Sequence, residues 1–221
     1  DKINLCIDIG NTSTKAGVFI NGSLQQWHKP FTAQQLLAYL DKGANVLVAN
    51  SGKNEAIQKH LLPHHYLTHN TPLPITISYD TPHTLGRDRI ATAVGAYSID
   101  ATCNWLVMDL GTCLTIDLVE NETFQGGMIS PGIQMRYSAM HHYTAALPLV
   151  DPDDKAQFPG KSTEKSMQVG VSRSVNMEIE GYIHQVNKAV GKLKIVDCSS
   201  RPLRFGKEVK NEIFARPKLV V

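Results

Sequence analysis

The first residues that could take part in chemistry are a carboxylate and a glycine that lie among small polar residues. Residues 8–15 read "DIGNTSTK" and lie between apolar runs at 3–7 and 16–20. Backbone N–H groups and short side chains in such a loop can bind phosphate oxygens, because no bulky side chain keeps the anion away. A carboxylate fits beside a phosphate when a cation lies between them. The stretch therefore predicts a phosphate cradle at Gly10, Asn11, Thr12 and Ser13, with Asp8 near a cation.

A plain β-hairpin is a second interpretation of the same stretch. Both flanking runs have the composition of strands, and Gly10-Asn11 is favourable turn chemistry. Taken alone, the stretch leaves both interpretations open.

The stretch belongs to an internal repeat. "LCIDIGNTSTKAGVFINGSLQQ" is echoed by "LVMDLGTCLTIDLVENETFQGG", so that Asp109 and Gly111 match Asp8 and Gly10, and Asn121 matches Asn21. One such tetrapeptide arises often by chance, but two copies in the same strand context, each followed by a turn signal, indicate a repeated unit. The repeat predicts two similar α/β halves.

A third carboxylate lies between two arginines in "LGRDRIATAVGAYS". Apolar and small residues follow at helical spacing, which places Asp88 near the start of a helix. One interpretation is an acidic residue that complements the helix dipole. The other is a general base for phosphoryl transfer, with Arg87 and Arg89 available to bind an anionic substrate.

The elements that must position these residues alternate between strands and helices. We expect helices at 32–40, 54–61, 133–142 and 163–190, a buried strand at 45–49, and an irregular stretch at 147–159. This order predicts three-layered α/β domains facing each other, with the ligand in the cleft between them. We divide the chain into halves at 1–84 and 85–221.

Composition limits the classes of function. The 221 residues include 22 basic and 20 acidic side chains that are scattered, so we expect no nucleic-acid partner. No apolar run approaches the roughly 20 residues of a membrane span, and no leader precedes the first strand. Four cysteines without paired spacing indicate reduced thiols and a cytoplasmic protein. The histidines at 60, 64, 65 and 69 lack the accompanying ligands of a metal site.

Four motifs in order resemble the type III pantothenate kinases of the acetate and sugar kinase/Hsp70/actin superfamily. They are "DIGNTSTKAGVF", "TLGRDR", "DLGTCLTID" and "GGMISPGIQMR". The resemblance implies two ribonuclease H-like (actin-like ATPase) domains with the active site between them, and a homodimer. It also implies ATP-dependent phosphorylation of pantothenate with Mg²⁺, the first step towards coenzyme A.

The resemblance also implies roles for single residues. Asp88 falls on the catalytic base, which takes the proton of the primary hydroxyl of pantothenate, and Asp109 on the ligand of a monovalent cation, K⁺ or NH₄⁺. The ATP and phosphate contacts would be Asp8, Gly10, Asn11, Thr12, Lys15 and Thr112. The pantothenate contacts would be Tyr79, Gly86, Arg87, Arg89 and Thr163.

The sequence departs from the family pattern at several positions. Residues 198–201, "CSSR", stand where the family has glycines that approach the adenosine. The stretch "VANSGKNE" at 48–55 stands where a Ser-Ser-Val string is common, Cys113 replaces an alanine, and Arg87 a small residue. The segment "GGMISPG" has the composition of an ordinary turn. By the resemblance, it lines the substrate pocket.

Two alternative functions follow from these observations. The departures at 198–201 are compatible with a catalytically weak or inactive relative that serves as an accessory or binding protein. The paired acidic loops are compatible with another phosphotransferase or a phosphohydrolase. The carboxylates Asp8, Asp88 and Asp109 favour an enzyme over a binding protein.

Overall fold

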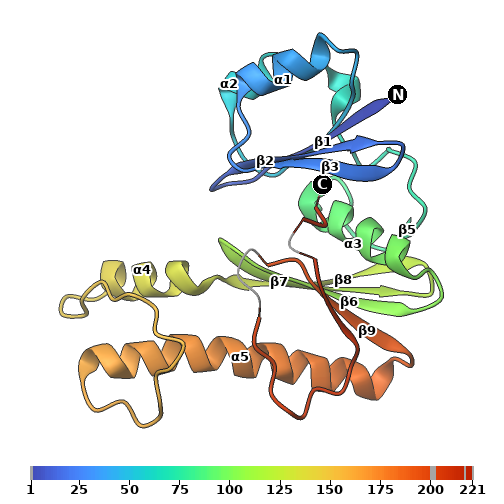
Figure 1. Cartoon of the computed structure of the whole chain (residues 1–221). Coiled ribbons are helices and arrows are strands. Elements are labelled where there is room, and N and C mark those ends of the chain that lie inside the picture. The colour runs from blue at the N-terminus through green and yellow to red at the C-terminus, as the bar shows by residue number, and fades with distance from the viewer. Residues whose placement is uncertain (1, 200–202, 217, 221) are drawn as a thin grey trace. The chain divides into compact units, whose positions relative to one another are not determined.

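A computed structural model describes residues 2–199, 203–216 and 218–220. Its contacts divide the chain into two compact units (Figure 1). The first comprises Asp1–Asp100, Glu122–Phe124 and Lys218–Val221, and the second Ala101–Asn121 and Gln125–Pro217. No helix within the described residues is long and apolar enough to cross a membrane.

The first unit is built on a four-stranded sheet in the order β3-β2-β1-β4. The strands are β1 (Ile3–Ile9), β2 (Thr14–Ile20), β3 (Ser23–His28) and β4 (Asn45–Asn50). β1 and β2 are antiparallel, whereas β4 runs parallel to β1. The apolar face of this sheet carries Leu5, Ile7 and Ile9, which alternate along β1 and pack against Leu36 and Ile57.

Those last two residues lie on the helices α1 (Ala33–Leu40) and α2 (Glu55–Gln58). α1 begins with a capping box, because Thr32 and Gln35 bond each other's backbone N–H groups. The helix expected at 54–61 is α2, and it is shorter. Bonds from His60 to Ile57 and from Leu61 to Gln58 continue it only as a tighter turn, ahead of the 3₁₀ helix η1 (Pro63–His65).

A short strand and a helix complete the first unit. β5 (Thr76–Ile77) pairs with the first residues of β8, and α3 (Arg87–Ile99) packs against β4. α3 starts one residue before Asp88, in agreement with the helical spacing of the sequence.

The second sheet has the order β10-β9-β6-β7-β8-β5. Its other strands are β6 (Asn104–Leu110), β7 (Cys113–Glu120), β8 (Thr123–Pro131), β9 (Leu193–Asp197) and β10 (Ile213–Ala215). β6 is antiparallel to β7 and parallel to β9. Gly126 and Gly127 lie within β8, not in a turn, and a side chain at Gly127 would overlap the Ile116 carbonyl oxygen.

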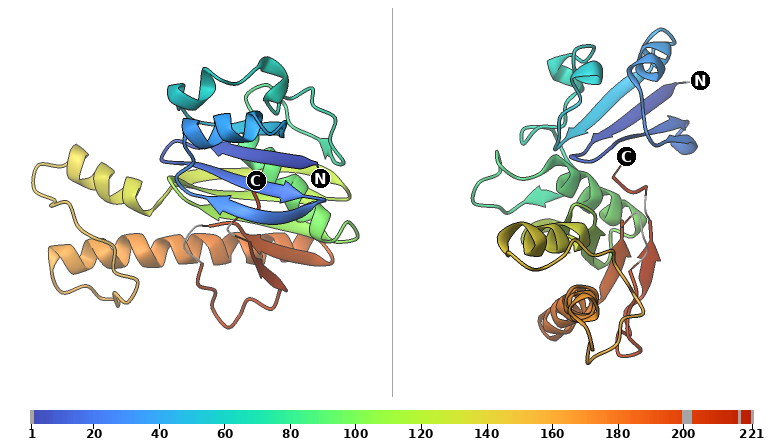
Figure 2. Two further views of the ribbon diagram at one scale, coloured as in Figure 1. Left: turned by 45° about the horizontal axis from the view of Figure 1, so that its top comes forward. Right: turned by 90° about the vertical axis from the view of Figure 1, so that its left-hand side faces the viewer.

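The helices α4 (Ile133–Tyr143) and α5 (Thr163–Ala189) belong to this unit. Val175, Ile179 and Ile183 recur on one face of α5 and pack against Leu106 and Met108 of β6. The views of Figure 2 show α4 beside the N-terminal half of α5, where Tyr137 of α4 packs against Met167 and Val171.

The two copies of the repeat fold alike. Each forms an antiparallel pair of strands, β1–β2 and β6–β7, with the acidic-glycine loop between them. At the following turn, Asn21 and Asn121 have φ values of 52° and 49°, in the left-handed region that asparagine tolerates. The matched asparagines therefore occupy equivalent turns.

Candidate functional site

The first acidic loop is a tight hairpin connection in the first unit. The Gly10 N–H donates to the Ser13 carbonyl at 3.2 Å, which closes the loop, and the side chains of Asn11 and Thr12 are exposed. Gly52 lies behind the loop so closely that a side chain there would overlap the Gly10 carbonyl oxygen. A hairpin and an anion cradle are thus compatible, since the turn leaves small polar groups at its tip.

Asp8 is the buried carboxylate of this loop. It lies opposite Lys15 in the ladder, its Oδ2 is 3.4 Å from the Lys15 Nζ, and the residue is 4% exposed. Its Oδ1 is buried and has no hydrogen-bond partner in the described part of the chain. Burial is the main reason that the pKa of Asp8 is raised; Lys15 opposes the rise and the Asp88 carboxylate adds to it.

An unpartnered carboxylate oxygen of this kind fits a hydrated divalent cation. Mg²⁺ takes oxygen ligands, keeps several of its waters and is bound through one or two carboxylates together with phosphates. A cation beside Oδ1 would stabilise the ionised carboxylate and so oppose the effect of burial on its pKa. Asp8, Gly10 and Lys15 therefore have the chemistry expected of a site for a metal-bound phosphate.

Asp88 is half-buried at the second position of α3. Its Oδ1 accepts a hydrogen bond from the Arg89 N–H at 2.9 Å. Gly86 makes this conformation possible, because a Cβ at that position would lie 2.6 Å from the same oxygen. The charge of Asp88 contributes to the raised pKa of Asp8, so the two carboxylates repel each other within the first unit.

The two arginines that flank Asp88 have different surroundings. The Arg87 guanidinium donates to the carbonyls of Pro82 and His83, at 3.3 and 3.1 Å, and so fixes the loop before α3. Arg89 is 6% exposed, and its guanidinium carbon lies 5.9 Å from the ring centroid of Tyr79 and 5.8 Å from that of Phe124. The predicted contacts Tyr79 and Arg89 are thus brought together by a cation–π arrangement.

The second acidic loop belongs to the second unit. Asp109 is half-buried near the end of β6, the Gly111 N–H donates to the Cys113 carbonyl at 2.9 Å, and Thr112 is exposed. Gly132 packs on this loop: its N–H donates to the Thr112 carbonyl at 3.1 Å, and a side chain there would overlap the Gly111 carbonyl oxygen. The start of α4 thereby fixes the loop.

Ser199 also holds this loop, a role that the sequence alone did not indicate. Its Oγ accepts the Leu110 N–H at 2.8 Å, and its own N–H donates to Asp197 Oδ1 at 2.9 Å. The departure from glycines in this segment is visible in the sequence, but the contact joins residues 89 positions apart. Of the segment 198–201, residues 200 and 201 lie outside the described residues.

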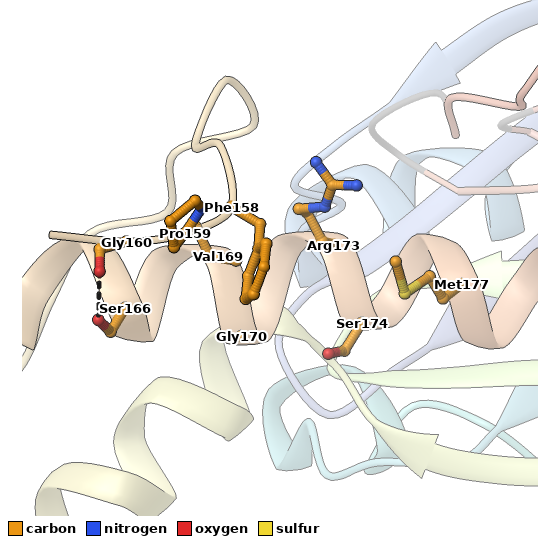
Figure 3. A pocket seen from close by; sticks show the side chains of 9 residues that line it. All are labelled: Phe158, Pro159, Gly160, Ser166, Val169, Gly170, Arg173, Ser174 and Met177. Carbon is orange, nitrogen blue, oxygen red and sulfur yellow. Dashed lines mark hydrogen bonds between the residues drawn. The ribbon is translucent and has the colours of Figure 1, made fainter.

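Thr163 is the first residue of α5 and is exposed, directly after the N-cap Ser162. A cavity of about 560 Å³ lies further along this helix (Figure 3). It is lined by Phe158, Pro159, Gly160, Ser166, Val169, Gly170, Arg173, Ser174 and Met177. No predicted site residue contributes to this lining, which is mainly apolar.

Two of the histidines lie in the 3₁₀ turn η1. Within the described residues, no group of three or more His, Cys, Asp or Glu side chains is arranged to hold a metal ion. His64 and His65 stack edge to face, with ring centroids 4.3 Å apart, and His65 Nδ1 accepts the Leu62 N–H at 3.0 Å. These rings stabilise the turn at η1.

Comparison with known proteins identifies relatives along the whole chain. Residues 4–185 match the family described as Type III pantothenate kinase. A type III pantothenate kinase of Cytophaga hutchinsonii is 37% identical over 98% of this chain and 94% of its own length. One from Flavobacterium johnsoniae is 34% identical over 98% of this chain and 93% of its own length.

Solved structures agree on the fold. A conserved putative Baf family transcriptional activator from Campylobacter jejuni superposes with a TM-score of 0.60 at 21% identity, over 98% of this chain and 92% of that one. A putative 2-dehydro-3-deoxygalactonokinase from Sinorhizobium meliloti gives 0.50 at 10% identity, over 87% and 85%. The expected α/β fold of the actin-like ATPase class is confirmed.

Proposed function

Because the chain belongs to the type III pantothenate kinase family, and is therefore a phosphotransferase that acts on pantothenate with ATP, we propose roles for its carboxylates in that reaction. The observation that carries the proposal is the pair Asp8 and Asp88. One is a buried carboxylate with an unpartnered oxygen beside a phosphate-type loop, and the other is a half-buried carboxylate whose charge raises the pKa of the first.

Asp88 is the general base. The chemical step needs a group that accepts the proton of the primary hydroxyl of pantothenate while that oxygen attacks the γ-phosphate. Asp88 retains acceptor capacity, since a carboxylate offers more lone pairs than its hydrogen bond with the Arg89 N–H uses. Gly86, Arg87, Arg89, Tyr79 and Thr163 bind pantothenate, with an arginine opposite its carboxylate.

Asp8 and Lys15 serve the phosphates. Mg²⁺ bound with ATP would neutralise charge on the phosphate oxygens, and Asp8 Oδ1 is the protein atom that would hold its hydration shell. Lys15 keeps the carboxylate oriented through the Oδ2 contact. Gly10, Asn11, Thr12 and Thr112 offer N–H groups and short side chains to phosphate oxygens, so the catalysis consists of positioning and charge neutralisation.

Asp109 binds a monovalent cation, K⁺ or NH₄⁺. Its carboxylate lies half-buried at the end of β6, next to a loop whose backbone is fixed by Gly132 and Ser199. Oxygen ligands in a rigid loop suit such a cation. A cation there would stabilise the second loop in a conformation that accepts phosphate.

We also propose a cytoplasmic homodimer. The cavity along α5 includes Phe158 and Met177, which are 76% and 60% exposed, and large exposed apolar side chains grouped in this way are typical of an interface.

The name of the Campylobacter jejuni protein refers to transcriptional activation. The buried carboxylate at the first loop, with its unpartnered oxygen, supports a phosphotransferase in this chain.

A product analysis tests the proposed reaction. Purified protein is incubated with ATP, Mg²⁺, K⁺ and pantothenate, and ADP and 4′-phosphopantothenate are measured by mass spectrometry. We expect the two products in equal amounts and no ADP without pantothenate. Release of phosphate from ATP irrespective of pantothenate would indicate a phosphohydrolase instead.

A further inference from the structure

We propose that Ser51 is a positioning residue for the hydrated Mg²⁺ of the nucleotide, acting together with Oδ1 of Asp8. The inference rests on the proposed function, since it concerns the metal that accompanies ATP. Ser51 follows β4 directly. Its hydroxyl oxygen is buried and has no hydrogen-bond partner in the described part of the chain.

The register of the parallel strands places Ser51 on the same face as Asp8. Asp8 pairs with Ala49, and Ile9 pairs with Asn50. Because side chains alternate along a strand, Ser51 shares the face of Ala49 and Asp8, whereas Asn50 shares the face of Ile9. Ile9 belongs to the apolar core under α1 and α2, so Ser51 lies on the opposite face, the one that carries the acid.

The backbone holds Ser51 firmly against the phosphate-type loop. Its N–H donates to the Ile9 carbonyl at 2.9 Å, which extends the ladder by one residue beyond β4. The next residue, Gly52, packs on the Gly10 carbonyl with no room for a side chain. Ser51 is therefore fixed relative to both Asp8 and Gly10 by contacts on either side.

Two buried oxygens on one face have no partner in the described part of the chain, which points to a ligand. A buried polar atom is almost always hydrogen-bonded, and each exception needs an explanation. The carboxylate Oδ1 only accepts, while the serine hydroxyl both donates and accepts, yet they do not bond each other. A group that bridges them satisfies both.

The chemistry of the pair favours metal-bound water over a phosphate oxygen. Asp8 repels a bare phosphate, so an anion next to it needs an intervening cation. Waters on Mg²⁺ are strong donors, and both a carboxylate and a serine hydroxyl accept from them. Ser51 would then fix the orientation of the hydration shell without being a ligand in the inner shell.

Calorimetric titration of ATP in two buffers tests the proposal. ATP is titrated into the wild-type protein and into Ser51→Ala and Ser51→Thr, once with Mg²⁺ and once with EDTA. Ser23→Ala is the matched control, because Ser23 is exposed at the start of β3. Thermal melts of all variants show whether each one folds.

We expect Mg²⁺ to increase the affinity of the wild type for ATP, and Ser51→Ala to reduce this increase by about three- to tenfold, as for loss of one ordinary hydrogen bond. Affinity in EDTA should be unchanged by the substitution. Ser51→Thr retains the hydroxyl and should behave as the wild type, as should Ser23→Ala.

Three results would overturn the assignment. An equal loss with Mg²⁺ and with EDTA would show that Ser51 contacts phosphate directly. No loss in either buffer would remove Ser51 from the site, and absence of ATP binding to the wild type would remove the nucleotide site itself. Because the titration contains no pantothenate, a wrong acceptor substrate leaves its outcome unaffected.

Discussion

Asp8 faces Lys15 across the β1–β2 ladder, with 3.4 Å between the carboxylate Oδ2 and the ammonium nitrogen, while its other oxygen is buried without a partner in the described part of the chain. The ion pair compensates only part of the cost of burying the acid. Desolvation is the larger effect, and the nearby Asp88 adds repulsion, so the pKa of Asp8 lies above its ordinary value of 3.8. Such a carboxylate is destabilising to the fold and suited to binding a cation.

The sign of the pKa shift predicts the effect of Asp8→Asn on stability. A raised pKa in the folded protein means that the protonated form is favoured there, so this stabilising contribution is present at low pH and is lost as pH rises through the raised value. At pH 7 the ionised Asp8 therefore lowers stability. We expect Asp8→Asn to melt at the same temperature or a few degrees higher at pH 7, and to lose at least about 100-fold in activity.

Melting curves at pH 7 and activity measurements check both parts. A fall of many degrees in the melting temperature would show that the Lys15 ion pair outweighs the burial of Asp8, and the predicted direction of the stability change would then be wrong.

Gly52 is predicted to be essential to the geometry of the first loop. In Gly52→Ala the new methyl group would overlap the Gly10 carbonyl, so the loop must move. We expect a loss of about 1–3 kcal/mol in the free energy of unfolding and weaker binding of ATP. Gly191→Ala is the control, since nothing lies within 4 Å of the added group. Denaturant unfolding and ATP titration give the two readouts; equal behaviour of the two variants would contradict the prediction.

Ser199 is predicted to stabilise the second loop. Ser199→Ala removes the acceptor of the Leu110 N–H in a place where the serine is 2% exposed. Leaving that donor unsatisfied should cost about 1–3 kcal/mol of unfolding free energy. Chemical denaturation of this variant beside the exposed-site control Ser23→Ala measures the difference. An effect no larger than that of the control would show that water replaces the hydroxyl.

The cation assignment predicts that activity depends on K⁺ or NH₄⁺. Asp109→Ala should lower the rate and remove this dependence together, because the carboxylate is the proposed ligand. Rates are measured in K⁺, NH₄⁺ and Na⁺ buffers of equal ionic strength. Full activity of the wild type with Na⁺ alone would argue against a selective site at Asp109.

Local pattern was sufficient to predict the repeat, the family and most helices and strands. The acidic-glycine loops and the matched Asn21 and Asn121 follow from residues close in sequence, and the structure places them in equivalent hairpins. α2 was expected to be longer, since the helical composition of 54–61 contains no sign that its last turn tightens. The division after residue 84 and the homodimer stay predictions.

Contacts between distant residues could not be predicted in this way. The carbonyl contacts of Arg87 depend on how the preceding loop turns back, and the location of Ser51 on the same face as Asp8 depends on strand register. Both the Ser199 contact and the packing of Gly132 on the second loop join segments that are separate in sequence. Such contacts form only when the strands pair into sheets, so they cannot be inferred from the local sequence.

The role of Asp88 is measured by the turnover of Asp88→Asn beside the wild type, with pantothenate binding followed by calorimetry. The substitution preserves size and the possible acceptor for the Arg89 N–H but removes the base. We predict a loss of at least about 100-fold in kcat, with pantothenate affinity within a few-fold of the wild type. Near-normal turnover of Asp88→Asn would contradict the assignment of Asp88 as the general base.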